Sequence, residues 1–223
     1  VMKVSVIGLG YVGCVSAACL AQAGHDVIGV DVSQLKVDMI NDGHSPIIEP
    51  GINDVLAEAI EKKRLTARTE TEPAIAASEL SLVCVGTPSQ PNGSLDLTYI
   101  RRACQQIGEV LAKIKHFHTV IIRSRMLPGS IEGTVIPTLE SASGKRVGQD
   151  FGVEQRPVQC AARQVDPIML AQRIEADARA RVLFTREDNG VDDGIGEARA
   201  PGRFQLGIEE LHVEAGIVGD QRG

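Results

Sequence analysis

A glycine-rich run near the N-terminus is the first group of residues whose types and spacing could do chemistry. It reads Gly8-Leu9-Gly10-Tyr11-Val12-Gly13, and it lies between an apolar segment over residues 4–7 and a small-residue helix pattern over residues 11–23. Backbone N–H groups at a helix N-terminus can bind a pyrophosphate. Such a site needs Gly8 for the tight turn, Gly10 for close approach of the phosphate, and Gly13 for close packing of helix on strand. The run therefore predicts a dinucleotide site; a glycine-rich turn without a ligand is the alternative.

An acidic residue follows at the spacing that such a site requires. Asp31 ends the next apolar run, residues 27–30, and comes twenty-three residues after Gly8. Its carboxylate could accept hydrogen bonds from both hydroxyls of the adenosine ribose and would repel a 2′-phosphate, which favours NAD over NADP. Asp31 could instead only cap the helix that begins near Ser33. Lys36, one helical turn further on, could contact the same ribose or be an ordinary solvated lysine.

A third candidate lies in the loop Gly86-Thr87-Pro88, directly after an apolar run over residues 80–85. Ligands of doubly wound folds bind at the carboxyl ends of the strands. Thr87 could therefore hydrogen-bond the ribose on the nicotinamide side, or it could only shape its loop.

The elements that must position these residues alternate along the first two thirds of the chain. Short apolar runs predict strands at residues 4–7, 27–30, 65–69, 80–85 and 119–122. Longer patterns predict helices at residues 11–23, 33–41, 97–113 and 128–139, with another opening at Pro50-Gly51. This alternation is typical of an α/β fold, a Rossmann-type doubly wound parallel sheet.

The character of the sequence changes near residue 153. Residues 1–153 hold seven Lys and seven Arg, whereas residues 154–223 hold nine Arg and no Lys, without a clear hydrophobic period. We therefore expect an NAD-binding domain over residues 1–153 and a poorly structured, irregular tail over residues 154–223.

Composition excludes several classes of partner. A net charge of −6 argues against nucleic acid and anionic membrane surfaces as partners. No apolar stretch has the length of a membrane span, and the N-terminus lacks the pattern of a signal peptide. Five cysteines without a CxxC pair suit reduced thiols, so we expect a cytoplasmic protein. The histidines show no metal-binding spacing, and His116 and His118 are expected at the surface.

Several motifs, taken together with the glycine-rich run and Asp31, resemble the UDP-glucose/GDP-mannose dehydrogenase family. They are Ser45-Pro46-Ile47-Ile48-Glu49-Pro50-Gly51, Cys84-Val85-Gly86-Thr87-Pro88-Ser89, Asn92-Gly93-Ser94-Leu95-Asp96-Leu97, Arg123-Ser124 and Leu127-Pro128-Gly129. The resemblance covers about residues 2–153 and is greatest to the branch that acts on GDP-mannose.

The resemblance implies an NAD-dependent oxidoreductase of polysaccharide biosynthesis. Such an enzyme oxidises the C6 alcohol of a nucleotide sugar to the uronate through a cysteine-bound intermediate. The implied NAD contacts are Tyr11, Val12, Asp31, Lys36 and Thr87. A homo-oligomer is possible.

Two departures from the family pattern leave no catalytic residue to assign. Arg125 stands where the family has a threonine near the nicotinamide, so its long cation could obstruct the site or pair with cofactor phosphate. The motif Asn-Pro-Glu-Phe-Leu, expected after residue 153, is replaced by Glu154-Gln155-Arg156-Pro157-Val158, and Cys160 lacks the surroundings of the family nucleophile.

These departures leave two main alternatives. The chain represents a nucleotide-sugar 6-dehydrogenase through its NAD-binding portion, or it is an inactive NAD-binding fragment of a truncated or frameshifted gene. A Rossmann dehydrogenase of another kind, acting on hydroxyacids or hydroxyacyl-CoA, fits the Glu-Pro-Gly and Gly-Thr-Pro loops less well.

Overall fold

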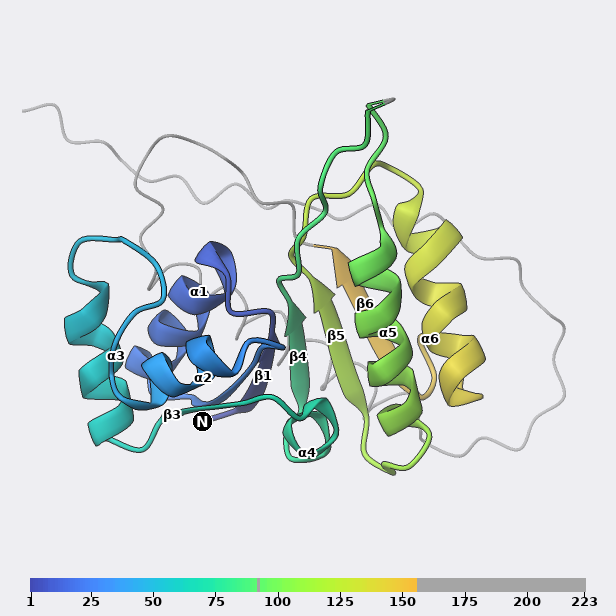
Figure 1. The fold of residues 1–223 in the computed structure, drawn as a ribbon. Coiled ribbons are helices and arrows are strands. Elements are labelled where there is room, and N and C mark those ends of the chain that lie inside the picture. Colours follow the sequence, from blue (N-terminus) through green and yellow to red (C-terminus); the bar gives the residue numbers. More distant parts are fainter. Residues whose placement is uncertain (92, 156–223) are drawn as a thin grey trace, which may run out of the picture. The chain divides into compact units, whose positions relative to one another are not determined.

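The computed structural model describes residues 1–91 and 93–155. They form one parallel sheet with helices on both faces (Figure 1). The expected irregular tail lies outside the described residues from position 156 onward. The α/β fold class is thus confirmed for the part of the chain that carries the candidate site.

Six parallel strands make the sheet, in the order β3-β2-β1-β4-β5-β6. Their bounds are β1 Lys3–Ile7, β2 Asp26–Val30, β3 Leu65–Arg68, β4 Leu80–Val83, β5 His118–Ile122 and β6 Phe151–Gln155. The order reverses direction between β1 and β4, which pair in register with Val4 opposite Leu80. This is the strand order of a dinucleotide-binding Rossmann fold, in which the ligand crosses the sheet at that reversal.

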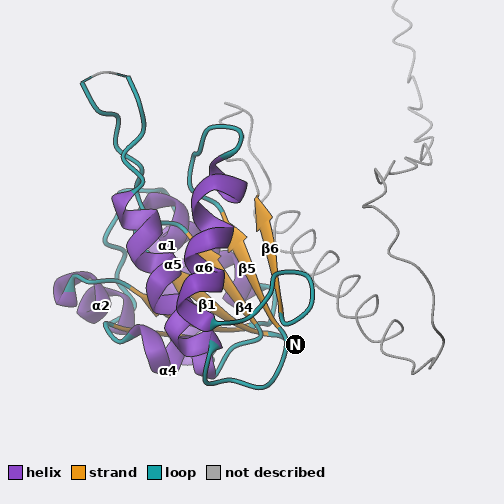
Figure 2. Cartoon of the chain, turned by 90° about the vertical axis from the view of Figure 1, so that its right-hand side faces the viewer, coloured by secondary structure: helices purple, strands orange, loops and turns teal. Residues whose placement is uncertain are grey.

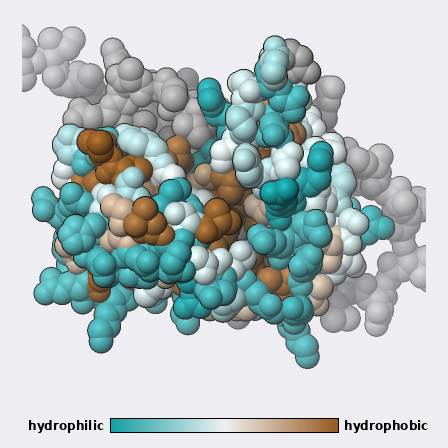
Figure 3. Space-filling model, viewed as in Figure 1, coloured by the Kyte–Doolittle hydropathy of each residue, from teal (hydrophilic) through white to brown (hydrophobic). Residues whose placement is uncertain are grey.

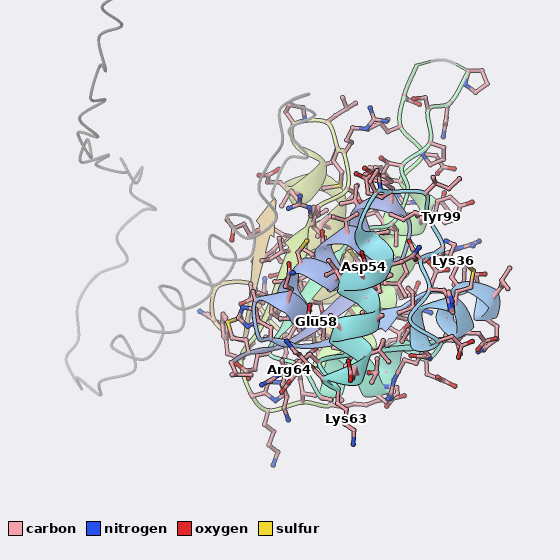
Figure 4. The ribbon with its side chains drawn as sticks, turned by 90° about the vertical axis from the view of Figure 1, so that its left-hand side faces the viewer. Lys36, Asp54, Glu58, Lys63, Arg64 and Tyr99 are labelled. Atoms are coloured by element: carbon pink, nitrogen blue, oxygen red, sulfur yellow. The ribbon has the colours of Figure 1, made fainter. Side chains whose placement is uncertain are left out.

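Helices connect the parallel strands along the chain. Their bounds are α1 Tyr11–Gln22, α2 Gln34–Asn41, α3 Ile52–Glu61, α4 Thr71–Ala76, α5 Thr98–Leu111, the π-helix η1 Ile131–Val135 and α6 Ile136–Ser143. Each helix turns an apolar side toward the sheet. On α3, for example, Leu56 and Ala59 are buried, while Asp54 and Glu58 lie on the outer face that Figure 4 presents.

Alternate residues along the strands divide the interior into two cores. Val4 and Val6 of β1 pack with α1, α2 and α3 on one face of the sheet, whereas Ile7 belongs to the other face, with α4, α5 and α6. Both faces of every central strand are therefore covered, which explains why these strands read as continuous apolar runs. Figure 2 shows β6 at one edge of this layered sheet. The side drawn in Figure 3 carries its apolar surface as separate patches.

Three elements differ from the prediction for physical reasons. The six-residue helix α4 is too short to show a helical period, and β6 contains Gly152 and two polar residues, so it lacks an apolar run. The helix expected over residues 128–139 begins only at Ile131, with a π-helical turn in which the Ile136 N–H bonds the Ile131 carbonyl. Pro137 follows directly and has no N–H to donate to a carbonyl four residues earlier, which favours the wider turn.

The expected surface position of His118 is wrong. Its side chain is fully buried (0% exposed) in the core face lined by α4 and α5. Nδ1 lies 3.1 Å from the Ser78 carbonyl oxygen and Nε2 lies 2.8 Å from the Ser81 hydroxyl. Because a carbonyl can only accept, Nδ1 carries the proton and Nε2 accepts from Ser81. Ser81 also lies 2.7 Å from the Ser5 hydroxyl, so a buried polar network joins β5, β4 and β1.

Candidate cofactor site at the carboxyl ends of the strands

The turn after β1 is shaped by contacts that only glycines permit. Gly8 has φ +94°, a left-handed conformation, and a Cβ there would lie 3.1 Å from the backbone carbonyl of Cys84. A Cβ on Gly13 would lie 1.8 Å from the Gly8 carbonyl oxygen, which no side chain tolerates. These two glycines therefore let α1 start directly against the ends of β1 and β4. The strand-turn-helix context predicted for the glycine-rich run is present.

Gly10 differs from its two neighbours because the protein itself does not require a glycine there. It is the N-cap of α1, with φ −75° and ψ −165°, a conformation open to any residue. A Cβ at this position would meet no atom within 4 Å. No side chain caps the N-terminus of α1, whose first backbone N–H groups have no acceptor within the helix. Open space thus adjoins free backbone donors, an arrangement that fits a bound phosphate.

Asp31 lies beside this turn with its carboxylate already hydrogen-bonded. Oδ2 accepts from the Leu9 N–H (2.8 Å) and from Lys36 Nζ (3.2 Å), and Oδ1 accepts from the Ser33 N–H (3.0 Å). Ser33 is the N-cap of α2 as expected, but its own side chain makes no capping bond. Asp31 therefore holds the turn after β1 and the start of α2 together, which is a structural role. Ribose binding by the same carboxylate stays a prediction.

The loops after β4 and β5 are joined by a series of hydrogen bonds. The Arg123 N–H donates to Val83 O (2.9 Å), and the Ser124 hydroxyl donates to Val85 O (2.5 Å). The Thr87 hydroxyl donates to Arg125 O (2.8 Å). Thr87 thus shapes its loop, the alternative left open by the sequence, and it lies at the carboxyl end of the sheet as predicted.

A contact that sequence reasoning missed joins Tyr11 to Glu49. The Tyr11 hydroxyl donates to Glu49 Oε2 (2.6 Å), and this bond is the main cause that raises the pKa of Tyr11. Tyr11 is half exposed at the start of α1, so the contact brings the loop before α3 to the entrance of the site. Glu49 belongs to the Ser45–Gly51 motif, and only the family resemblance could have drawn attention to it.

The four cysteines of residues 1–91 and 93–155 are packing residues rather than nucleophiles. Burial raises the pKa of Cys84 and of Cys104 to about 12, and burial also raises the pKa of Cys14. Cys19 is 7% exposed. A thiol reacts as the thiolate, so none of the three with a raised pKa is prepared for covalent catalysis at neutral pH. Cys160 lies outside the described residues.

Other kinds of site find no support within the described part of the chain. No group of three or more His, Cys, Asp or Glu side chains there could hold a metal ion. None of the helices described has both the length and the apolar composition needed to cross a membrane. The glycine-rich turn is bordered by backbone amides, by the Asp31 carboxylate and by the loops that follow β4 and β5.

Comparison with known proteins agrees with this geometry. Residues 2–165 match the model of the UDP-glucose/GDP-mannose dehydrogenase family, NAD binding domain. A GDP-mannose 6-dehydrogenase of Azotobacter vinelandii is 51% identical over 156 residues, which cover 70% of this chain and 36% of the relative. A UDP-glucose 6-dehydrogenase of Haloferax volcanii is 38% identical over the same shares of the two chains. The chain therefore spans little more than a third of the length of these relatives.

Solved structures show the same likeness. A ternary complex of GDP-mannose dehydrogenase from Pseudomonas aeruginosa superposes with a TM-score of 0.73 and 36% identity, over 84% of this chain and 49% of that one. A UDP-glucose dehydrogenase from Pyrobaculum islandicum gives a TM-score of 0.69 and 31% identity, over 80% of this chain and 44% of that one.

Proposed function

Because the chain belongs to the UDP-glucose/GDP-mannose dehydrogenase family, we propose that it supplies the cofactor-binding portion of an NAD-dependent nucleotide-sugar 6-dehydrogenase. The observation that carries the proposal is the open space at Gly10, beside the uncapped N-terminus of α1. A glycine that neither the backbone nor the packing of the protein requires is explained by a ligand that approaches the backbone closely.

In this proposal each part of the dinucleotide has its own group of residues. The pyrophosphate lies against the backbone at Gly8, Gly10 and Gly13, where the partial positive charge of the α1 N-terminus favours an anion. Tyr11 and Val12 provide the first helical N–H groups. Thr87 lies on the side of the nicotinamide ribose. When NAD is bound, its nicotinamide supplies the acceptor for a hydride.

The choice of NAD over NADP rests on Asp31. A carboxylate offers about four acceptor positions, and three are occupied by the donors of Leu9, Ser33 and Lys36. One acceptor position is therefore left, so the carboxylate can bind both ribose hydroxyls only if the Lys36 ammonium moves away. The Lys36 side chain is 38% exposed and flexible enough to do so, and Figure 4 shows where it lies on α2. A 2′-phosphate would meet the carboxylate directly and be repelled.

The substrate and activity of the whole enzyme are proposed from the relatives. The higher identity to GDP-mannose 6-dehydrogenases than to a UDP-glucose 6-dehydrogenase favours GDP-mannose. We expect no turnover by this chain itself, since burial raises the pKa of the Cys14, Cys84 and Cys104 thiols and no catalytic group is assigned among the described residues. The reduced cysteines suit a cytoplasmic protein. A homo-oligomer is compatible with this assignment.

Calorimetric titration of the purified chain with NAD tests the proposal. We expect Gly10→Val to weaken NAD binding at least about tenfold, equivalent to about 1.4 kcal/mol, because its side chain fills the phosphate space. Its melting temperature should fall by only a few degrees, since a Cβ at Gly10 contacts no protein atom and valine is a poorer N-cap than glycine by about 1 kcal/mol. Gly133→Val is the matched control: Gly133 also has open space around it but lies in η1, away from the turn.

Two results would contradict the proposal. If Gly10→Val binds NAD as tightly as the parent, the assignment of the phosphate site to this turn is refuted. Formation of NADH from GDP-mannose or UDP-glucose by the purified chain would refute the expectation that it does not turn over.

A further inference from the structure

Arg125 is the cationic residue that the hydrogen-bonded loops place beside Thr87. It comes three residues after the end of β5, and its carbonyl accepts the Thr87 hydroxyl hydrogen bond (2.8 Å). The preceding residue, Ser124, is 6% exposed and is bonded to Val85. The backbone of Arg125 is therefore fixed at the carboxyl end of the sheet, while its side chain is exposed.

The strand order assigns this position to one half of a bound dinucleotide. Asp31, at the end of β2, marks the adenosine half, and β4 and β5 lie on the other side of the strand-order reversal. In a Rossmann fold the second mononucleotide binds at this second group of strands. Arg125 thus lies on the nicotinamide half of the proposed site.

The loop after β4, which holds Thr87, also carries an acidic residue, Asp96. Asp96, which follows Thr87 in the same loop, accepts a hydrogen bond from the Thr98 N–H. The bonds to Thr98 and the neighbouring Arg101 and Arg102 lower the pKa of the Asp96 carboxyl. The Asp96 carboxylate is thus engaged by Thr98, Arg101 and Arg102 at the start of α5.

We propose that Arg125 makes the site bind the reduced cofactor more tightly than the oxidised one, an inference that rests on the proposed function. The oxidised nicotinamide ring carries a positive charge, whereas the reduced ring is neutral. A guanidinium on the nicotinamide half therefore repels only the oxidised form. Over a few ångströms in a partly solvated site, this repulsion corresponds to about a threefold to tenfold difference in affinity.

A different role for the same side chain gives a different result. If the guanidinium pairs with the pyrophosphate, it attracts both cofactor forms equally, because the two forms carry the same phosphate charge. The ratio of the two dissociation constants therefore separates the two roles, whatever the absolute affinity.

The test is calorimetric titration of the full chain with NAD⁺ and with NADH, at low and at high salt. We expect tighter binding of NADH in the parent, and a loss of most of that preference in Arg125→Gln. Arg125→Lys should retain the preference because it keeps the charge. Arg146→Gln is the control for net charge, since the exposed Arg146 lies before β6, at the amino ends of the strands. Salt should reduce the preference of the parent, since ions screen an exposed charge.

Each outcome has a defined consequence. An Arg125→Gln protein that binds both forms with the parent's ratio overturns the inference and leaves the proposed function intact. Equal weakening of both forms assigns the guanidinium to the phosphates and likewise overturns it. Absence of binding of either form by the parent refutes the proposed function, and this inference with it.

Discussion

Acidification should destabilise the domain through one buried histidine. Burial lowers the pKa of His118 from 6.5 to about 4, against the hydrogen bond to the Ser78 carbonyl, which raises it. The nearby His116 lowers it further. The folded state therefore holds His118 neutral under conditions in which the unfolded chain binds a proton. The stability due to this difference is fully present above about pH 6.5 and is lost as the pH falls toward 4.

The size of this loss of stability follows from the difference between the pKa of His118 in the folded and unfolded chain. A tenfold change in proton affinity is worth about 1.4 kcal/mol, so complete loss amounts to about 3 kcal/mol. Most of the decrease, about 2 kcal/mol, should fall between about pH 7.5 and about pH 5. For a domain whose total stability is about 5–15 kcal/mol, a change of this size is readily measured.

The assay is urea denaturation of the parent and of His118→Gln, each followed at several pH values. His118→Gln should be less stable at neutral pH, because it disrupts the Ser81 and Ser78 contacts, but its stability should fall less steeply on acidification. His44→Gln is the matched control, since His44 is exposed and lies outside the network. Should His118→Gln fail to fold, NMR titration of the His118 ring in the parent measures the same quantity. Parallel pH curves for parent and variant, or protonation of the folded ring near pH 6.5, would refute the reasoning.

Two further predictions follow from the packing of the same domain. Gly13→Ala should cost on the order of 3 kcal/mol or prevent folding, because its Cβ would lie 1.8 Å from the Gly8 carbonyl oxygen. Gly133→Ala, which has open space around it and lies in η1, should be neutral or slightly stabilising in the same chemical denaturation experiment. Cys84 and Cys104, with pKa values of about 12, should react with iodoacetamide at about pH 8 roughly a thousandfold more slowly than an ordinary thiol. Peptide mapping with and without denaturant checks this, and equal labelling in both conditions would contradict the burial argument.

The elements and residues that the sequence predicted are those with strong local signals. The strands β1, β4 and β5 are buried along nearly their whole length, and β2 is partly buried, so their largely apolar runs were recognisable. The glycine-rich turn was predicted because Gly8 and Gly13 meet requirements of the backbone itself. Cys14 and Cys19 lie within the small-residue pattern of α1, and both are buried there.

The elements and contacts that escaped prediction depend on tertiary structure. The strand β6 is recognisable only through its pairing with β5, where Phe151 lies opposite His118. The burial of His118 depends on the Ser78 and Ser81 partners, which lie 40 and 37 residues away in the sequence. Local pattern carries no information about such partners, because a buried polar group is tolerated only when the fold brings its hydrogen-bond partner to it.

A residue at the site can be assigned a binding role only where the structure of the protein itself does not already require that residue. Asp31 is held by three donors without any ligand, so loss of NAD binding in an Asp31 variant could reflect either a lost ribose contact or a displaced turn. Thr87 is ambiguous in the same way, because its hydroxyl already bonds Arg125. Gly10 has neither limitation, since its backbone conformation is ordinary and a Cβ there would contact nothing. A defect in cofactor binding caused by a side chain at Gly10 can therefore be attributed to the cofactor space itself.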